Sequence, residues 1–195
     1  MTVYIQKGWQ HSHSMLIAKL YEEAFGAKFQ CAVADKNQRI ELLSNCFVPH
    51  YSFAAFSNNV PVGLAGFNVE SGSHTGGIGA KGLIKQLGLL RGVWACVVFS
   101  LFERQPDEQE LVMDGIAVDS QFRGQGIGSM LLDHIISYAG ENGFTSVRLD
   151  VIDSNDRARK LYESKGFVAV KTESYPYLEW LLGFSGATTM KLTLS

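Results

Sequence analysis

One segment of the chain, residues 116–167, constrains the fold more than any other. It opens with the apolar residues I-A-V and passes through the loop D-S-Q-F-R-G-Q-G-I-G into a pattern typical of an amphipathic helix. Gly124, Gly126 and Gly128 let the backbone approach a ligand without a Cβ in the way. Because the first amides of a helix lack partners and its dipole favours negative charge there, this strand–loop–helix unit predicts a diphosphate site.

The amides of the loop are the groups expected to contact that diphosphate. They belong to Arg123, Gly124, Gln125, Gly126, Ile127, Gly128 and Ser129. Further along, Asn155 and Tyr162 are separated by two helical turns, so a helix there would present both on one face.

At these positions the chain resembles the GCN5-related N-acetyltransferase (GNAT) superfamily. The acyl-CoA motif of that family, R/Q-x-x-G-x-G/A, is matched by Arg123, Gly126 and Gly128. Its later motif, N-x-x-A-x-x-L-Y-x-x-x-G-F, is matched by Asn155, Ala158, Leu161, Tyr162, Gly166 and Phe167. Two motifs in the expected order are more specific than either alone, and together they cover about a quarter of the chain.

A dinucleotide-binding βαβ unit is the first alternative. Gly124, Gly126 and Ser129 approximate G-x-G-x-x-G, and Asp150 follows at about the expected 20-residue distance. The fit is worse, because a serine replaces the third glycine and residues 119–123 separate the strand from the first glycine. This alternative also leaves the later motif unexplained.

Composition limits the remaining classes of protein. The 195 residues suit a single domain, residues 1–195, and 46% apolar with 18% charged residues indicates a globular chain with a sizeable core. A net charge of −2 without a long basic run gives no support for a nucleic-acid partner. The start lacks the apolar core of a signal peptide, and no apolar run is long enough to form a transmembrane segment, which predicts a cytoplasmic location.

The hydrophobic periods predict an α+β fold. Its central sheet would be mixed and mostly antiparallel and flanked by helices. The resemblance implies the GNAT acyl-CoA N-acyltransferase fold with α/β/α layers. Strands are expected at residues 3–6, 51–57, 60–69, 110–118, 146–151, 167–173 and 188–194, and helices at 13–25, 37–46, 128–140 and 155–165. Asn58 and Asn59 tolerate positive φ and predict a tight hairpin. The first helix is expected to present Leu16, Leu20 and Tyr21 on one face, with Ser12 or Ser14 as its cap.

Residues 71–109 form an insertion relative to a compact domain of this family. Six apolar residues at alternating steps of four and three predict an amphipathic helix there: Leu83, Leu87, Leu90, Trp94, Val97 and Leu101. A strand at V-V-F-S-L-F is the alternative. Three roles remain open, namely a lid that packs over the acceptor, a subunit contact and an interfacial helix, and the apolar content is compatible with a homodimer.

The resemblance implies an acetyl-CoA-dependent N-acyltransferase, in which a primary amine attacks the thioester directly. Ile116, Ala117 and Val118 would expose backbone groups to the pantetheine arm, and the Val118 amide would bind the thioester oxygen. The alternative is an ordinary strand with every amide paired. Asn155 would contact the CoA arm, cap its helix, or do both.

Two residues are candidates for proton transfer. Tyr162 would protonate the departing thiolate, since a phenol with a pKa near 10 is a suitable donor; otherwise it is a core tyrosine. Asp114 would draw the proton from the amine, with Glu110 as the alternate; otherwise it is a carboxylate at the rim. The acceptor, a small-molecule or peptide amine, is not identified.

No metal is expected. His11 and His13 lack a third ligand nearby, and Cys31, Cys46 and Cys96 show neither C-x-x-C spacing nor a paired histidine pattern. A non-catalytic acyl-CoA-binding or interaction module remains the second candidate function.

Overall fold

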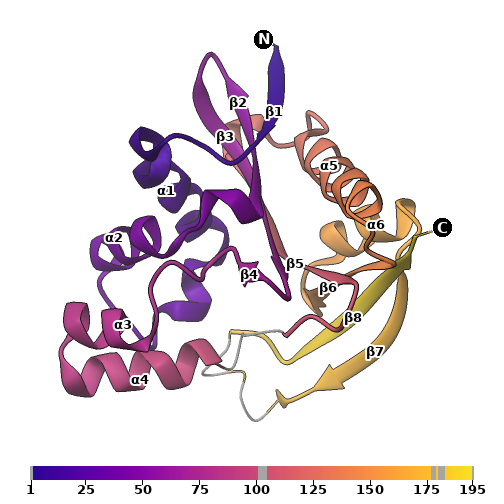
Figure 1. Ribbon diagram of the computed structural model, residues 1–195. Coiled ribbons are helices and arrows are strands. Elements are labelled where there is room, and N and C mark those ends of the chain that lie inside the picture. The colour runs from indigo at the N-terminus through magenta and orange to yellow at the C-terminus, as the bar shows by residue number, and fades with distance from the viewer. Residues whose placement is uncertain (1, 101–104, 177–178, 180–182, 195) are drawn as a thin grey trace.

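The computed structural model of the protein describes residues 2–100, 105–176, 179 and 183–194. Within these residues, eight strands form one mixed sheet in the order β1-β2-β3-β5-β6-β8-β7, with β4 paired to β3 outside this path (Figure 1). β5 and β6 run parallel, and every other described pair is antiparallel. The strands are β1 (Val3–Lys7), β2 (Ser52–Ser57), β3 (Val60–Val69), β4 (Gly72–Ser73), β5 (Glu110–Val118), β6 (Ser146–Ile152), β7 (Val168–Ser174) and β8 (Gly186–Thr193). The predicted fold class is confirmed.

Helices cover both faces of the sheet (Figure 1). On one side lie α1 (Ser14–Phe25) and α2 (Lys36–Cys46), and on the other α5 (Ile127–Glu141) and α6 (Asp156–Ser164). The insertion contributes α3 (Ala80–Leu87) and α4 (Leu89–Ser100). Short 3-10 turns are η1 (His11–His13), η2 (Gly26–Phe29), η3 (Pro49–Tyr51) and η4 (Ser120–Phe122).

Successive side chains of β2 point to opposite faces of the sheet, so this strand contributes to the core on both faces. Phe53 and Ala55 pack with the α5 side, whereas Ala54 and Phe56 pack with the α1 side. All six residues of this strand are buried, as expected for a strand covered by helices on both faces. The positive φ angles of Asn58 (50°) and Asn59 (62°) confirm the predicted hairpin between β2 and β3.

Two predictions for α1 were wrong. Neither Ser12 nor Ser14 caps the helix, because His13 is at the N-cap and η1 leads directly into the first turn. The Ser14 hydroxyl instead accepts a hydrogen bond from Trp9 Nε1 at 3.2 Å. Leu16 is 40% exposed, and Ile17 occupies the buried position beside Leu20 and Tyr21.

The insertion forms two helices where one was predicted. Gly88, with φ of 80°, separates α3 from α4, and a Cβ on Gly92 would collide with the backbone of Ile84, so the two helices pack closely. Residues 97–100 are helical, which excludes a strand there; Leu101 and Phe102 lie outside the described residues. None of the described helices has the length and apolar character needed to cross a membrane.

The predicted apolar stripe does not form the packing face of α4. Gly92, Ala95 and Val98 are buried, while Leu90 is 85% exposed and Trp94 45% exposed. The inner side of the helical pair packs against α2 through a cluster that contains Leu42, Cys46 and Leu83, with partly buried Ile78, Leu87, Cys96 and Phe99 around it.

Candidate active site

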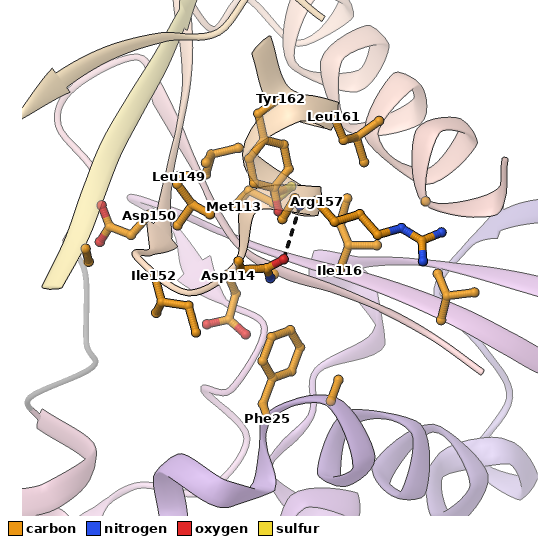
Figure 2. Close-up of a pocket in the computed structure, with 18 of the residues that line it drawn as sticks. Phe25, Met113, Asp114, Ile116, Leu149, Asp150, Ile152, Arg157, Leu161 and Tyr162 are labelled. Atoms are coloured by element: carbon orange, nitrogen blue, oxygen red, sulfur yellow. Dashed lines mark hydrogen bonds between the residues drawn. The ribbon is translucent and has the colours of Figure 1, made fainter. Parts of the chain in front are cut away.

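The two parallel strands in the middle of the sheet separate from one another. β5 pairs with β6 from Glu110 to Met113 only, whereas β6 stays paired with β8 as far as Ile152. The rest of β5 stays paired with β3 through Val118. A cavity of about 780 Å³ occupies the resulting opening, and residues of both strands line it (Figure 2).

The separation leaves backbone groups of β5 directed into this cavity. The Asp119 amide donates to the Val62 carbonyl of β3 at 2.9 Å. Because amides alternate in direction along a strand, those of Val118 and Ile116 point the opposite way, toward the opening. The Val118 carbonyl shares this direction and accepts a hydrogen bond from Arg123 Nε at 3.1 Å.

The glycine loop gives the cavity its anion-binding end. Gly124 has φ of 83° and Gly126 has φ of 81°, a conformation that residues with a Cβ rarely adopt. A Cβ built on either glycine meets no atom within 4 Å, so open space lies in front of the backbone. α5 begins at Ile127 without a side-chain cap, which leaves its first amides available to a bound anion.

Arginines contribute positive charge to the same cavity. Arg123, Arg148 and Arg157 all line it. Arg148 forms an ion pair with Glu110. Arg157, labelled in Figure 2, is exposed on α6. Sequence reasoning did not select Arg148 or Arg157; the position of Arg157 two residues after Asn155 was the available signal.

Tyr162 is the buried polar residue of the α6 wall. In Figure 2 its ring extends from α6 into the cavity, toward Met113 on β5 and Leu149 on β6. The side chain is 6% exposed, and burial raises the pKa of its hydroxyl from 10.0 to about 12. The phenol therefore keeps its proton at neutral pH and can act as a donor.

Asn155 begins the same helix. Its Oδ1 accepts a hydrogen bond from the Ala158 amide at 3.1 Å. The side chain caps α6 and also lines the cavity. Capping thus stabilises the first turn of the helix that carries Tyr162.

Asp114 lies where β5 leaves β6. The Tyr21 hydroxyl of α1 donates a hydrogen bond to Asp114 Oδ2 at 2.8 Å. Burial, and then the charge of Asp114 and this hydrogen bond, raise the pKa of Tyr21 well above its ordinary value of 10.0. Tyr21 therefore remains a donor and holds the carboxylate in place.

Glu110, the alternate carboxylate, is in a different environment. It is 2% exposed and forms ion pairs with Arg148 Nε at 2.7 Å and Lys191 Nζ at 2.8 Å. Burial acts to raise its pKa, but the hydrogen bonds and charges of Lys191 and Arg148 outweigh burial, so the pKa lies below the ordinary value. Glu110 does not line the cavity, and its ion pairs join three strands.

Most of the predicted site residues meet in this one cavity. Those that line it are Asp114, Ile116, Val118, Arg123, Gly124, Gly126, Ile127, Gly128, Ser129, Asn155 and Tyr162. Ala117 and Gln125 do not: Ala117 is buried in the core, and Gln125 Nε2 donates to the Gln121 carbonyl outside the cavity. Aromatic side chains that the sequence did not indicate complete the wall, namely Phe25, Phe122, Tyr175 and Phe184.

A cluster suited to a metal is not found in the described part of the chain, where no three His, Cys, Asp or Glu side chains come together. The chemistry of the cavity is that of a phosphate-binding backbone, arginines, a phenol and a carboxylate.

Separated parallel strands, a glycine loop at a helix N-terminus and a tyrosine on the next helix are the features that the resemblance to the GNAT superfamily predicted. The chain belongs to the acetyltransferase (GNAT) family, whose sequence model matches residues 15–167. The predicted resemblance is thereby confirmed.

Individual relatives match shorter segments. A [ribosomal protein bS18]-alanine N-acetyltransferase of Salmonella typhimurium is 36% identical over 88 residues, which are 44% of this chain and 57% of that protein. A thialysine N-epsilon-acetyltransferase of Bos taurus is 36% identical over 58 residues, 30% of this chain and 34% of that protein. The aligned segment thus spans little more than half the length of the first relative.

Solved structures support the fold over the whole chain. A Salmonella typhimurium structure that contains its cofactor acetyl-CoA has a TM-score of 0.63 at 16% identity, covering 100% of this chain and 95% of that one. The ribosomal-protein-S18-alanine N-acetyltransferase of Escherichia coli has a TM-score of 0.60 at 20% identity, covering 100% and 95%.

Proposed function

We propose that this chain transfers an acetyl group, or another short acyl group, from acyl-CoA to a primary amine. One observation carries the proposal: the opening between β5 and β6 brings the glycine loop, the free edge of β5 and Tyr162 into a single cavity. Membership of the acetyltransferase family and the structural neighbour with bound acetyl-CoA support the same activity.

The glycine loop and the arginines bind the cosubstrate. The amides that follow Arg123 surround the diphosphate, and Arg123 and Arg157 supply positive charge beside it. The pantetheine arm continues between β5 and β6, where the edge of β5 no longer pairs with β6 and offers hydrogen bonds. These contacts position the thioester carbonyl near the Val118 amide.

The reaction is a direct aminolysis. Asp114 accepts a proton from the incoming ammonium, and the neutral amine attacks the thioester carbon to form the C–N bond. The Val118 amide stabilises the oxyanion, a contribution of roughly 3–4 kcal/mol for such a donor. As the C–S bond breaks, Tyr162 gives its proton to the departing thiolate, and the surplus proton that the nitrogen loses restores the Tyr162 hydroxyl. A hydroxyl pKa of about 12 keeps Tyr162 protonated until that step.

An amine panel tests this activity. The protein is mixed with acetyl-CoA and each amine, and release of CoA thiol is measured; a reaction without amine corrects for the exposed thiol of Cys31. We expect release that depends on the amine. If acetyl-CoA binds in calorimetry but no amine releases thiol, the alternative of a non-catalytic acyl-CoA-binding module is correct.

The acceptors of the relatives suggest two types of amine for the panel. One relative acts on the alanine of ribosomal protein bS18 and another on thialysine, so peptide N-termini and small amines both belong in it. The cytoplasmic location and the homodimer stay predictions from the sequence. The exposed apolar residues of α4 support a contact between two copies, which light scattering tests directly.

A further inference from the structure

A second cavity of about 540 Å³ is lined by Asp114 but by no residue of the glycine loop. Asp114 and Asn68 line both cavities, so the two meet at these side chains. The walls of the second cavity come from α1, α2, the turn after β3 and the inserted α3 and α4. Its volume is within the range of small-molecule sites.

The charges of the two cavities differ: among the described lining residues, the first has as many acids as arginines, whereas the second has acids alone. Among its described lining residues, the second cavity has two charged side chains, Glu70 and Asp114, and both are acidic. The first cavity is lined by three arginines in addition to its carboxylates. Acidic groups attract an ammonium and disfavour a carboxylate, so the second cavity is suited to a cation without an attached acid.

Aromatic and aliphatic side chains form the rest of this cavity. Phe29 and Phe99 meet edge to face with ring centroids 5.2 Å apart, and Tyr21 stacks near Phe29 at 6.4 Å. All three rings line the cavity, together with Leu42, Ile78 and Leu83. Such a wall favours an apolar body, and aromatic faces also favour a nearby ammonium.

We propose that the second cavity binds the acceptor, and that the acceptor is a small monoamine with an apolar, aryl-sized body and no carboxylate. Its nitrogen lies at Asp114, next to the thioester, and its body lies between α2 and the inserted helices. The Tyr21 hydroxyl fixes the carboxylate that receives the nitrogen. This inference rests on the proposed acetyl transfer and assigns the insertion to acceptor selection.

Calorimetry in the presence of CoA tests the binding step without turnover. The probes are 2-phenylethylamine, L-phenylalanine, n-butylamine, spermidine and a tetrapeptide that begins with alanine. We expect 2-phenylethylamine to bind at least ~10-fold more tightly than each of the others, because it alone joins an aryl body to an amine without an acid. Equal or tighter binding of any of the other four probes would overturn the inference.

Matched variants locate the bound amine. Ile78→Trp fills the second cavity and should weaken 2-phenylethylamine binding at least ~10-fold, whereas Val93→Trp, on the exposed side of α4 and outside the cavity, should not change it. Glu70→Gln should weaken binding several-fold, and Glu41→Gln, an exposed acid on α2 that lines neither cavity, should leave it unchanged. CoA affinity should be the same in all four variants.

The failure of this inference differs from the failure of the proposed function. If n-butylamine or the peptide is acetylated and Ile78→Trp has no effect on any acceptor, the transferase activity stands and the acceptor assignment falls. If 2-phenylethylamine binds but no amine releases thiol, the transferase activity falls.

Discussion

The two cavities that meet at Asp114 are built from different parts of the chain and by different means. The first depends on the backbone: a positive-φ glycine loop, the start of α5 and the free edge of β5. The second is shaped by side chains from α1, α2 and an insertion. A backbone site needs glycines at fixed spacing, which a sequence displays directly, whereas a side-chain site can be assembled from residues with no common pattern.

The largest effect is expected from the backbone of the first cavity. Gly126→Val should abolish CoA binding in calorimetry, because φ of 81° strains a β-branched residue and its side chain enters the open space in front of the loop. Gly143→Val is the matched control. Gly143 has φ of 78° and also faces open space, so a valine there causes similar backbone strain. Because Gly143 lies after the other end of α5, away from the glycine loop, CoA affinity should be unchanged. Wild-type affinity of the Gly126 variant would disprove the backbone assignment.

Tyr162→Phe should have the next largest effect. Loss of the proton donor should lower kcat by roughly 10²–10⁴-fold while CoA affinity changes little, because the hydroxyl is needed only as the thiolate departs. Tyr138→Phe, a partly buried tyrosine of α5 that lines neither cavity, is the control. With a pKa of about 12, Tyr162 should cause no alkaline loss of kcat below about pH 11.

Asp114→Asn tests the point where the two cavities meet. The amide keeps an oxygen for the Tyr21 hydroxyl but cannot accept a proton from the ammonium. We expect kcat/KM to fall by about 10–100-fold at neutral pH and to recover partly at high pH, where more amine is neutral. Asp133→Asn, an exposed residue of α5, is the control. If the variant keeps the wild-type rate and pH profile, Asp114 is not the base.

The same contrast explains what the sequence could and could not predict. Strand periods and the hairpin at Asn58 and Asn59 follow from local spacing, and the structure contains them. The glycine loop and Tyr162 were also selected from local spacing, and both line the first cavity. Arg148 could not be selected, because pairing of β5 with β6 brings it to the cavity from another part of the chain. The break at Gly88 was missed because the apolar spacing continues across it.

The prediction of the packing face of α4 was wrong for a related reason. Its inner side uses Gly92 and Ala95, small residues that allow close contact with α3, while larger apolar residues remain exposed. A pattern based on apolar size therefore selected the wrong side of the helix. The residues of the second cavity could likewise not be predicted from the sequence, since they come together only after the insertion folds onto α2.

Glu110 should have the smallest effect on catalysis, although it is a carboxylate on the same strand as Asp114. Because Glu110 lies in neither cavity, the variant Glu110→Gln should leave kcat unchanged. The same variant should lower the free energy of unfolding by about 3 kcal/mol at pH 7, since Arg148 and Lys191 lose a buried partner. Its lowered pKa means that this stabilisation is present above the ordinary value of 4.5 and is lost as the pH falls through the folded-state value. Urea unfolding should therefore show a smaller difference between variant and wild type at strongly acidic pH than at pH 7. A fall in kcat without loss of stability would instead place Glu110 in the chemistry and remove the distinction between the two carboxylates of β5.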